Sequence, residues 1–349
     1  MPSSTSSSRE RPVEGPWGLT WALAALLIAG LLGGLEMRLR DQDYSPSTSI
    51  DNELWSAQRH KVYWPDKTPV VLVGASRISA GFSPRAFNSE FSGYRAIMLA
   101  RAGKAPAATL IDLAEDEDFK EGVVVVSMLA EHMVKRRRND QRSVVKAYGE
   151  LTENYGFINH FANRQIQAHI EDTFAFRSPH VDLEAWLDAE RGVEDAEFPK
   201  PNYVRAHADT SRSLDYSKKN VKVHRNKRIR KHRKNLRKHK PAKPKRWLKG
   251  TRFLEEAIDQ LIDRGIEVVL VRYPTCGKFY ELDEEHYPRK KYWDRFAKKT
   301  RAKTIHFEDY EALRGYECPD SSHLNFEDVP EFTRALGGVM AELGVIEVD

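Results

Sequence analysis

The sequence lacks the motifs on which several large enzyme classes depend. It has no phosphate-binding G-x-x-x-x-G-K-[ST] loop, no G-x-G-x-x-G leading into a helix, and no zinc-type spacing of cysteine and histidine. Only two cysteines, Cys276 and Cys318, occur in 349 residues. These absences disfavour nucleotide and metal enzymes, so we expect no cofactor and no metal ion.

Charge is absent from one segment near the start of the chain. Residues 15–35 form 21 positions without a charged side chain, and at about 1.5 Å per helical residue they reach roughly the 30 Å of a bilayer core. Trp17 and Trp21 stand where interface anchors are found. We predict a single-pass transmembrane anchor over residues 17–35. A cleaved signal peptide is the alternative.

Acidic residues are absent from a second segment. Residues 218–249, here called the basic arm, hold 17 Lys and Arg and no Asp or Glu, so the rest of the chain carries a formal charge of −12. Such runs contact nucleic acid, anionic lipid headgroups or acidic polymers. Nucleic acid is disfavoured as a partner, because an exported domain anchored in a membrane would rarely meet it. The arm can instead contact the bilayer or an acidic glycan, or it can be a solvated and disordered insertion without a partner.

Apolar runs alternate with helical spacing over most of the remaining chain. Continuous runs typical of strands buried on both faces cover residues 69–74, 95–100 and 122–129, then 266–274 and, more weakly, 303–310. Helical patterns follow them, at 83–91, 106–119, 251–265, 285–299 and 326–343. The sequence predicts an α/β fold: a flavodoxin-like three-layer sandwich around a mainly parallel five-stranded sheet.

The same patterns divide the chain. We predict a disordered cytoplasmic head over residues 1–16, the anchor over 17–35, a stalk over 36–66 and the α/β domain over 67–345. The third strand is followed by a helical and basic insertion, residues 135–250, that interrupts the domain.

A serine stands where the first predicted strand ends. Ligands of open α/β sheets bind beyond the carboxyl ends of the strands, and Ser76 comes directly after Gly74 and Ala75 at such an end. A serine in this place can be a nucleophile, and it can equally be a helix cap.

A D-x-x-H pair lies just before the last predicted helix. At this spacing the carboxylate of Asp320 can hold one ring nitrogen of His323, which leaves the other nitrogen to accept a proton from a serine. Asn325 is the predicted cap of the helix that follows. One α/β sheet would bring this loop to the strand end that carries Ser76, so the three residues predict a Ser-His-Asp triad.

Three sequence blocks together resemble the SGNH/GDSL hydrolase family, in particular its membrane-anchored, acyltransferase-like or esterase-like branch. These blocks are Gly74-Ala75-Ser76-Arg77, Gly103 within LARAGKAP, and Asp320 with His323. The family's Gly-x-Asn-Asp block after the third strand is absent, and only Glu131 or His132 stand near that place. The resemblance covers roughly residues 68–132 and 250–345.

The resemblance implies specific chemistry. Ser76 would be the nucleophile, His323 the base and Asp320 its orienting partner, with the N–H groups of Gly103 and Ser76 as oxyanion donors. His132 can replace the missing asparagine as a donor, or it can be a histidine whose hydrogen bonds are satisfied at the end of a strand. Arg77 would bind an anionic group or form a structural salt bridge.

The implied protein is a membrane-anchored serine esterase or O-acyltransferase, with its domain on the periplasmic side of the inner membrane. It would transfer or remove acetyl groups on a cell-surface glycan, or act on another ester, beside a multi-span acyl-exporting partner. A non-catalytic binding protein of the cell envelope, retaining the fold, is the alternative.

Both cysteines fall in loops at the same predicted edge of the sheet. If oxidised, Cys276 and Cys318 would join the loop of the acid and base to the neighbouring strand end. The alternative is a pair of unpaired thiols.

Overall fold

The computed structural model describes residues 17–153 and 157–347, so the predicted head lies outside the described residues. Five parallel strands form one sheet in the order β2-β1-β3-β6-β7. Their bounds are β1 Thr68–Val73, β2 Tyr94–Met98, β3 Val123–Ser127, β6 Glu267–Arg272 and β7 Lys303–His306. The predicted fold class is confirmed, and the direction of winding reverses between β1 and β3, as in other doubly wound folds.

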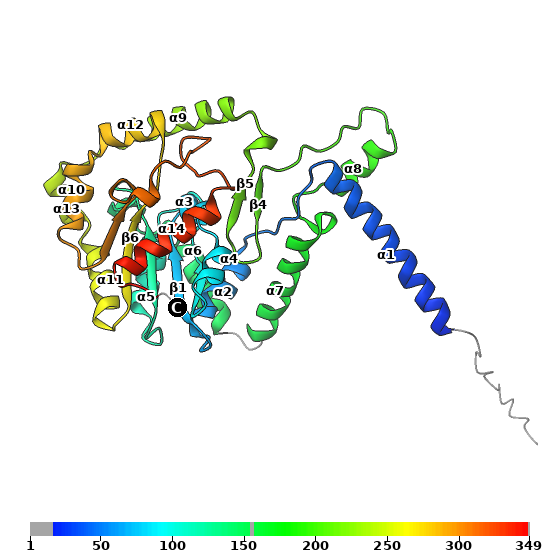
Figure 1. Ribbon diagram of the computed structural model, residues 1–349, viewed down its shortest axis with the longest axis horizontal. Helices are drawn as coiled ribbons and strands as arrows, with labels where there is room; N and C mark the ends of the chain where they lie inside the picture. The colour runs from blue at the N-terminus through cyan, green and yellow to red at the C-terminus, as the bar shows by residue number, and fades with distance from the viewer. Residues whose placement is uncertain (1–16, 154–156, 348–349) are drawn as a thin grey trace, which may run out of the picture.

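Alternate residues of each strand face opposite layers of helices, which explains the uninterrupted apolar runs. In β1, Val71 and Val73 belong to one buried cluster, whereas Val70 and Leu72 belong to the other. The first cluster includes apolar residues of α5 (Ala107–Glu115) and α11 (Arg252–Asp263), and the second includes residues of α4 (Pro84–Glu90) and α14 (Val329–Glu342). Figure 1 shows the resulting three layers.

Two predicted helices differ from the structure. The helix predicted over residues 285–299 is wrong, because α12 (Gly277–His286) begins earlier and α13 (Trp293–Ala297) is separate, with Pro288 between them. Proline lacks the N–H that would continue the helix. The last helix begins after its N-cap Asp328, and the Asn325 side chain instead donates to Glu327.

The insertion between β3 and α11 is folded. It contains α6 (Arg142–Thr152), α7 (Phe157–Thr173), α8 (Leu183–Glu190), the hairpin of β4 (Val204–Ala206) with β5 (Arg212–Leu214), α9 (Val221–Lys238) and α10 (Pro244–Gly250). The basic arm is therefore mostly α9 and α10, and it buries His232, Leu236 and Trp247. The alternative that this arm is a disordered insertion is therefore wrong. Figure 1 shows α9 along the top of the molecule, above α3 (Ser76–Gly81).

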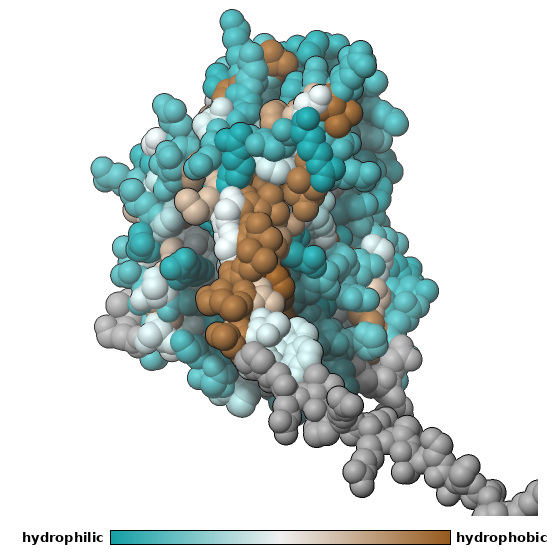
Figure 2. Space-filling view, turned by 90° about the vertical axis from the view of Figure 1, so that its right-hand side faces the viewer, coloured by the Kyte–Doolittle hydropathy of each residue, from teal (hydrophilic) through white to brown (hydrophobic). Residues whose placement is uncertain are grey.

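One helix among the described residues, α1 (Trp17–Asp41), is long and apolar enough to cross a membrane. A signal sequence has the same properties. The leucines of α1 between residues 19 and 32 are exposed, whereas Leu39 is buried, and Figure 2 shows a brown column of apolar residues on a mainly teal surface.

Part of the predicted stalk belongs to the domain. Helix α2 (Asn52–His60) buries Leu54 and Trp55 completely, and the Trp55 indole N–H donates to the carbonyl of Leu99 beyond β2 at 2.9 Å. Residues 52–60 therefore lie within the α/β domain and do not separate it from α1.

Two adjacent glycines of α14 provide a test of the packing against α4. A Cβ on Gly337 would collide with the buried ring of Phe91, whereas a Cβ on Gly338 would meet nothing within 4 Å. We expect Gly337→Ala to lower the free energy of unfolding by about 1–3 kcal/mol through overpacking. Gly338→Ala should raise it by about 0.5–1 kcal/mol, because alanine favours the helix. Urea denaturation followed by circular dichroism measures the free energy of unfolding of both variants. Equal effects of the two substitutions would contradict the packing of Gly337 against Phe91.

Candidate active site

The chain turns sharply between β1 and α3, and Ser76 is the first residue after that turn. Gly74 permits the turn, since a Cβ there would clash with the Ile78 side chain and lie 3.0 Å from Cβ of Ser127 at the end of β3. Ala75 is extended and provides no side-chain cap. The N–H of Ser76, at the start of a helix, has no acceptor within that helix.

Asp320 and His323 occupy a tight turn before α14. One oxygen of Asp320, Oδ1, accepts hydrogen bonds from the N–H groups of Ser322 and His323, both at 2.9 Å. The other, Oδ2, lies 3.0 Å from Nδ1 of His323. The Asp320 carboxylate is completely buried, so the turn and its charge are fixed together.

The turn places the imidazole against the serine. Nε2 of His323 lies 2.8 Å from Oγ of Ser76, across 247 positions of sequence. An ionised Asp320 can only accept, which assigns the hydrogen to Nδ1 and leaves Nε2 to accept the hydroxyl proton of Ser76. The structure thus brings together the three residues of the predicted triad in a relay geometry.

The charges around this relay favour a neutral imidazole and an ionised carboxylate. Burial lowers the pKa of His323 below its usual range. The cations of Arg228 and Arg77 lower this pKa further, whereas Asp320 raises it. Burial alone would raise the pKa of Asp320, but the hydrogen bond and charge of His323, with Arg228, hold that pKa well below its usual range. His323 is therefore in its basic form at neutral pH.

Sequence reasoning missed Arg228, which lies on α9. Its Nε lies 2.7 Å from Oδ2 of Asp320, as an ion pair without the alignment of a hydrogen bond. One turn earlier on the helix, Arg225 donates to the carbonyl of Pro319 at 2.8 Å. The basic arm was recognised, but its charge alone did not indicate which residues face the domain.

A cavity of about 430 Å³ opens in front of Ser76, and it is lined by all three other residues predicted to bind the oxyanion or substrate: Arg77, Gly103 and His132. Gly103 adopts a φ of 75°, which suits glycine, and its N–H belongs to the loop after β2. Glu131 also lines the cavity.

His132 has the properties of a neutral hydrogen-bond donor or acceptor. It is buried, its Nδ1 has no hydrogen-bond partner among the described residues, and its Nε2 lies 3.9 Å from Glu131. Burial and the neighbouring Arg137 and Arg77 lower its pKa well below the usual range. A neutral imidazole carries one N–H, which an oxyanion in the cavity can accept.

The two cysteines are free in the structure, so the possible disulfide between them is not formed there. Hydrogen bonding by the neighbouring Cys318 lowers the pKa of the Cys276 thiol. The N–H of Cys276 donates to the carbonyl of Ser321 at 3.1 Å, which ties the end of β6 to the turn of Asp320 by the backbone alone.

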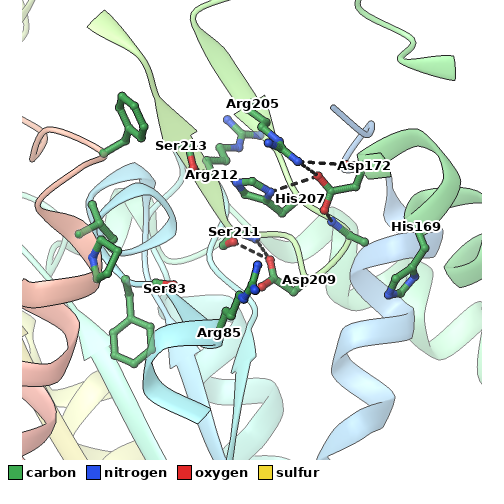
Figure 3. Close-up of a pocket in the computed structure, with 15 residues that line it drawn as sticks. Ser83, Arg85, His169, Asp172, Arg205, His207, Asp209, Ser211, Arg212 and Ser213 are labelled. Atoms are coloured by element: carbon green, nitrogen blue, oxygen red, sulfur yellow. Dashed lines mark hydrogen bonds and ion pairs between the residues drawn. The ribbon is translucent and has the colours of Figure 1, made fainter. Parts of the chain in front are cut away.

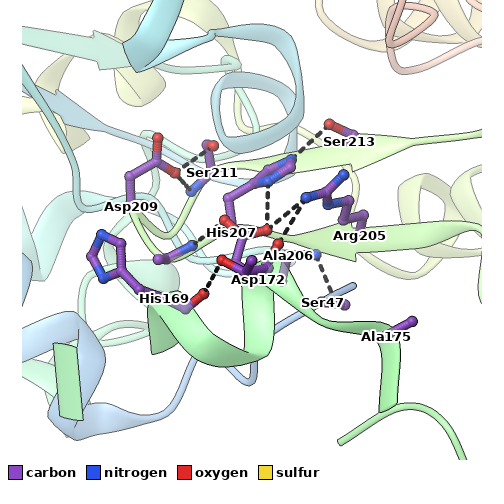
Figure 4. A network of polar contacts seen from close by, with 12 residues as sticks. Ser47, His169, Asp172, Ala175, Arg205, Ala206, His207, Asp209, Ser211 and Ser213 are labelled. Carbon is purple, nitrogen blue, oxygen red and sulfur yellow. Dashed lines mark hydrogen bonds and ion pairs between the residues drawn. The ribbon is translucent and has the colours of Figure 1, made fainter. Parts of the chain in front are cut away.

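A second Ser-His-Asp set occurs in the insertion, beside another cavity of about 410 Å³ (Figure 3). His207 has its Nε2 2.8 Å from Oγ of Ser213 and its Nδ1 3.2 Å from Oδ1 of Asp172. Asp172 also accepts from Arg205 at 3.0 Å, as Figure 4 shows, and from the N–H of Ala208 at 3.1 Å.

The surroundings of this second set indicate a structural role. Ser213 lies within β5, where the register pairs it with Arg205 in the antiparallel ladder, so no helix start presents unpaired N–H groups to its hydroxyl. The contacts of Asp172 fasten the β4–β5 hairpin to the end of α7. We assign the set to stability and not to catalysis.

Comparisons with known proteins add little to this geometry. The chain matches no family model and no curated protein. Among solved structures, it is similar to the crystal structure of TesA with a TM-score of 0.35 and 11% identity, over 79% of this chain and 99% of that one. At that TM-score the likeness carries no argument, and the site rests on the contacts described above.

The pKa of His323 tests the electrostatics of the relay. Because the Arg228 cation lowers this pKa, Arg228→Gln should raise it, and the imidazole should protonate at a higher pH than in the parent chain. The ¹³Cε1 shift of labelled histidine, assigned with His323→Gln, measures it. Arg230→Gln is the matched control, on an exposed position of the same helix that does not line the cavity. A lower or unchanged pKa in Arg228→Gln would contradict the arrangement.

Proposed function

We propose that this chain is a membrane-anchored serine esterase or O-acyltransferase that acts through Ser76, His323 and Asp320. The observation that carries the proposal is the relay of 2.8 Å from Ser76 to His323 and 3.0 Å from His323 to Asp320. It lies at the start of a helix, at the carboxyl ends of the strands, where α/β folds place ligands. The resemblance of the sequence blocks to SGNH/GDSL hydrolases agrees with it.

In the first half of the reaction, Oγ of Ser76 attacks the ester carbonyl carbon while its proton passes to Nε2 of His323. Asp320 holds Nδ1–H and stabilises the imidazolium that forms. His323 then gives the proton to the leaving alcohol oxygen as the carbon–oxygen bond breaks, which leaves an acyl group on Ser76. Water or a sugar hydroxyl reverses these steps in the second half and restores the serine hydroxyl.

The negative charge that develops on the carbonyl oxygen needs donors. The N–H groups of Ser76 and Gly103 are two candidates, and the neutral imidazole of His132 is the third, in place of the asparagine that the family would supply. All three residues line the same cavity.

The location of the reaction is a further part of the proposal. A helix with the length and apolarity of α1 supports a single-pass anchor. With the domain on the periplasmic side, the substrate would be a cell-surface glycan carrying acetyl groups. A multi-span acyl-exporting protein would then supply the acyl group in the transfer reaction.

A non-catalytic envelope protein that retains the fold is the second candidate. One specific feature favours it: Arg228 shares the carboxylate of Asp320 with His323, and this added cation opposes the imidazolium on which acyl transfer depends. The absence of the Gly-x-Asn-Asp block points the same way.

Labelling with a fluorophosphonate probe separates the two candidates. We expect the purified chain to be labelled on Ser76, and Ser76→Ala to lose the label along with esterase activity, by on the order of 10⁴-fold or more. Ser213→Ala is the matched control, because it removes the serine of the second Ser-His-Asp set, and it should label like the parent. Equal labelling of the parent and Ser76→Ala would refute the proposal that the chain is a serine enzyme.

His132 tests the composition of the oxyanion site. His132→Ala should lower kcat by about 10²–10³-fold with little change in KM, because an oxyanion donor acts mainly in the transition state. His132→Asn, which restores an amide donor at this position, should recover part of the loss. Steady-state hydrolysis of a neutral acetyl ester measures both variants. Equal kcat in the parent and His132→Ala would remove His132 from the oxyanion site.

A further inference from the structure

The cavity in front of Ser76 is lined by more positive than negative side chains. Its cations are Arg77, Arg136, Arg137, Arg228 and Lys231, whereas Glu131 is its one carboxylate among the described lining residues. Two of these cations are compensated, Arg137 by Asp140 and Arg228 by Asp320, each at 2.7 Å. The other three have no ion pair with a carboxylate in the described part of the chain, so the cavity has an excess of positive charge.

Arg77 is the least exposed of the three. Its Nε is buried and has no hydrogen-bond partner, although one terminal nitrogen donates to Oγ of Ser322 at 3.0 Å. Its guanidinium lies 5.2 Å from the centre of the Phe279 ring. Burial, with the nearby cation of Arg272, lowers the pKa of Arg77 to about 10, so it is still positive at neutral pH. Asp283 and Glu131 partly oppose this lowering, and an anion that enters the cavity would stabilise this partly buried cation further.

The wall of the cavity that α9 and α12 form is held in place by its own contacts. His232 of α9 stacks on Phe279 of α12, with ring centres 3.8 Å apart, and its Nε2 lies 2.7 Å from Oδ1 of Asp283. Oδ2 of Asp283 in turn accepts from Arg272 of β6 at 3.0 Å. Lys231, next to His232, therefore projects from a fixed helix, which Figure 1 shows along the top of the molecule.

We propose that the ester on which Ser76 acts carries a carboxylate or phosphate on its alcohol part, bound by Arg77 and Lys231. This inference rests on the proposed function. His323 must protonate the leaving oxygen, so the alcohol part of the ester lies next to His323. Arg77 donates a hydrogen bond to Ser322, the residue directly before His323, and therefore lies on the same side of the site as the alcohol part. An anionic sugar esterified next to its charged group has this chemistry.

Four defined esters test the proposal with the full chain in detergent. They are methyl glucoside monoacetate, methyl glucuronide monoacetate, the monoacetate of methyl glucoside 6-phosphate, and methyl glucoside hemisuccinate, whose charge is on the acyl part. We expect at least one anionic acetate to exceed the neutral acetate in kcat/KM by about 10-fold or more, as charge-assisted hydrogen bonds allow. The glucuronide and the phosphate distinguish the two kinds of anion.

Variants of the two cationic residues then test where the anionic group of the substrate binds. Lys231→Gln, at an exposed position, and Arg77→Gln should each reduce the preference for the anionic acetate, mainly through KM. Arg230→Gln, on the opposite face of α9, should keep it. The preference should also shrink as the salt concentration rises, because exposed charges are screened.

Two results would overturn the inference and leave the proposed function in place: Ser76-dependent hydrolysis of all four esters with equal kcat/KM, or a preference for the hemisuccinate alone. A preference that survives in Lys231→Gln and Arg77→Gln would also overturn it. If no ester is hydrolysed in a Ser76-dependent way and the fluorophosphonate does not label Ser76, the proposed function itself fails.

Discussion

The buried carboxylate of Asp320 is the constraint on which the rest of the site depends. A carboxylate without solvent is stable only when its oxygens are occupied, and here two backbone N–H groups take Oδ1 while the imidazole of His323 and the cation of Arg228 share Oδ2. These contacts set the shape of the turn, the tautomer of His323 and the docking of α9. One residue thereby joins the end of the α/β domain to the insertion.

The order of the strands explains why residues so distant in sequence meet. Because β1 lies beside the central strand β3, at the point where the winding reverses, the loops after β1, β2 and β3 open toward one crevice, and the loop before α14 returns to it. The insertion leaves the sheet after β3 and comes back across the same crevice as α9. It supplies a wall of the cavity and most of its exposed positive charge.

The sequence was most informative where apolar pattern or fixed spacing decides the structure. The five buried strands could be predicted from continuous runs such as VVLVG, and the D-x-x-H spacing correctly placed Asp320 beside His323. The sequence predicts a stalk where α2 lies, because the polar residues of this helix conceal the buried Leu54 and Trp55. The prediction of one helix over residues 285–299 is wrong because it follows the helical spacing and overlooks Pro288, which separates α12 from α13.

The basic arm shows the limit of pattern reasoning in physical terms. Helix α9 has almost no apolar residues, so it has no stripe from which an inward face could be read. It docks through polar contacts instead: the stacked ring of His232, its bond to Asp283 and the ion pair of Arg228. The spacing of residues 228, 232 and 235 fits one helix face, but charge composition alone gives no reason to choose it over the opposite face.

The two Ser-His-Asp sets show why residue types and distances do not by themselves define a catalytic site. Their serine-to-histidine distances are equal, at 2.8 Å. Ser76, however, begins a helix with unpaired N–H groups and faces a cavity of excess positive charge, whereas Ser213 lies within a paired strand and its aspartate is committed to Arg205 and the N–H of Ala208. Acyl transfer needs a place for the oxyanion as much as a nucleophile. Only the first set offers that place, so the environment of each serine, and not the triad alone, assigns the function.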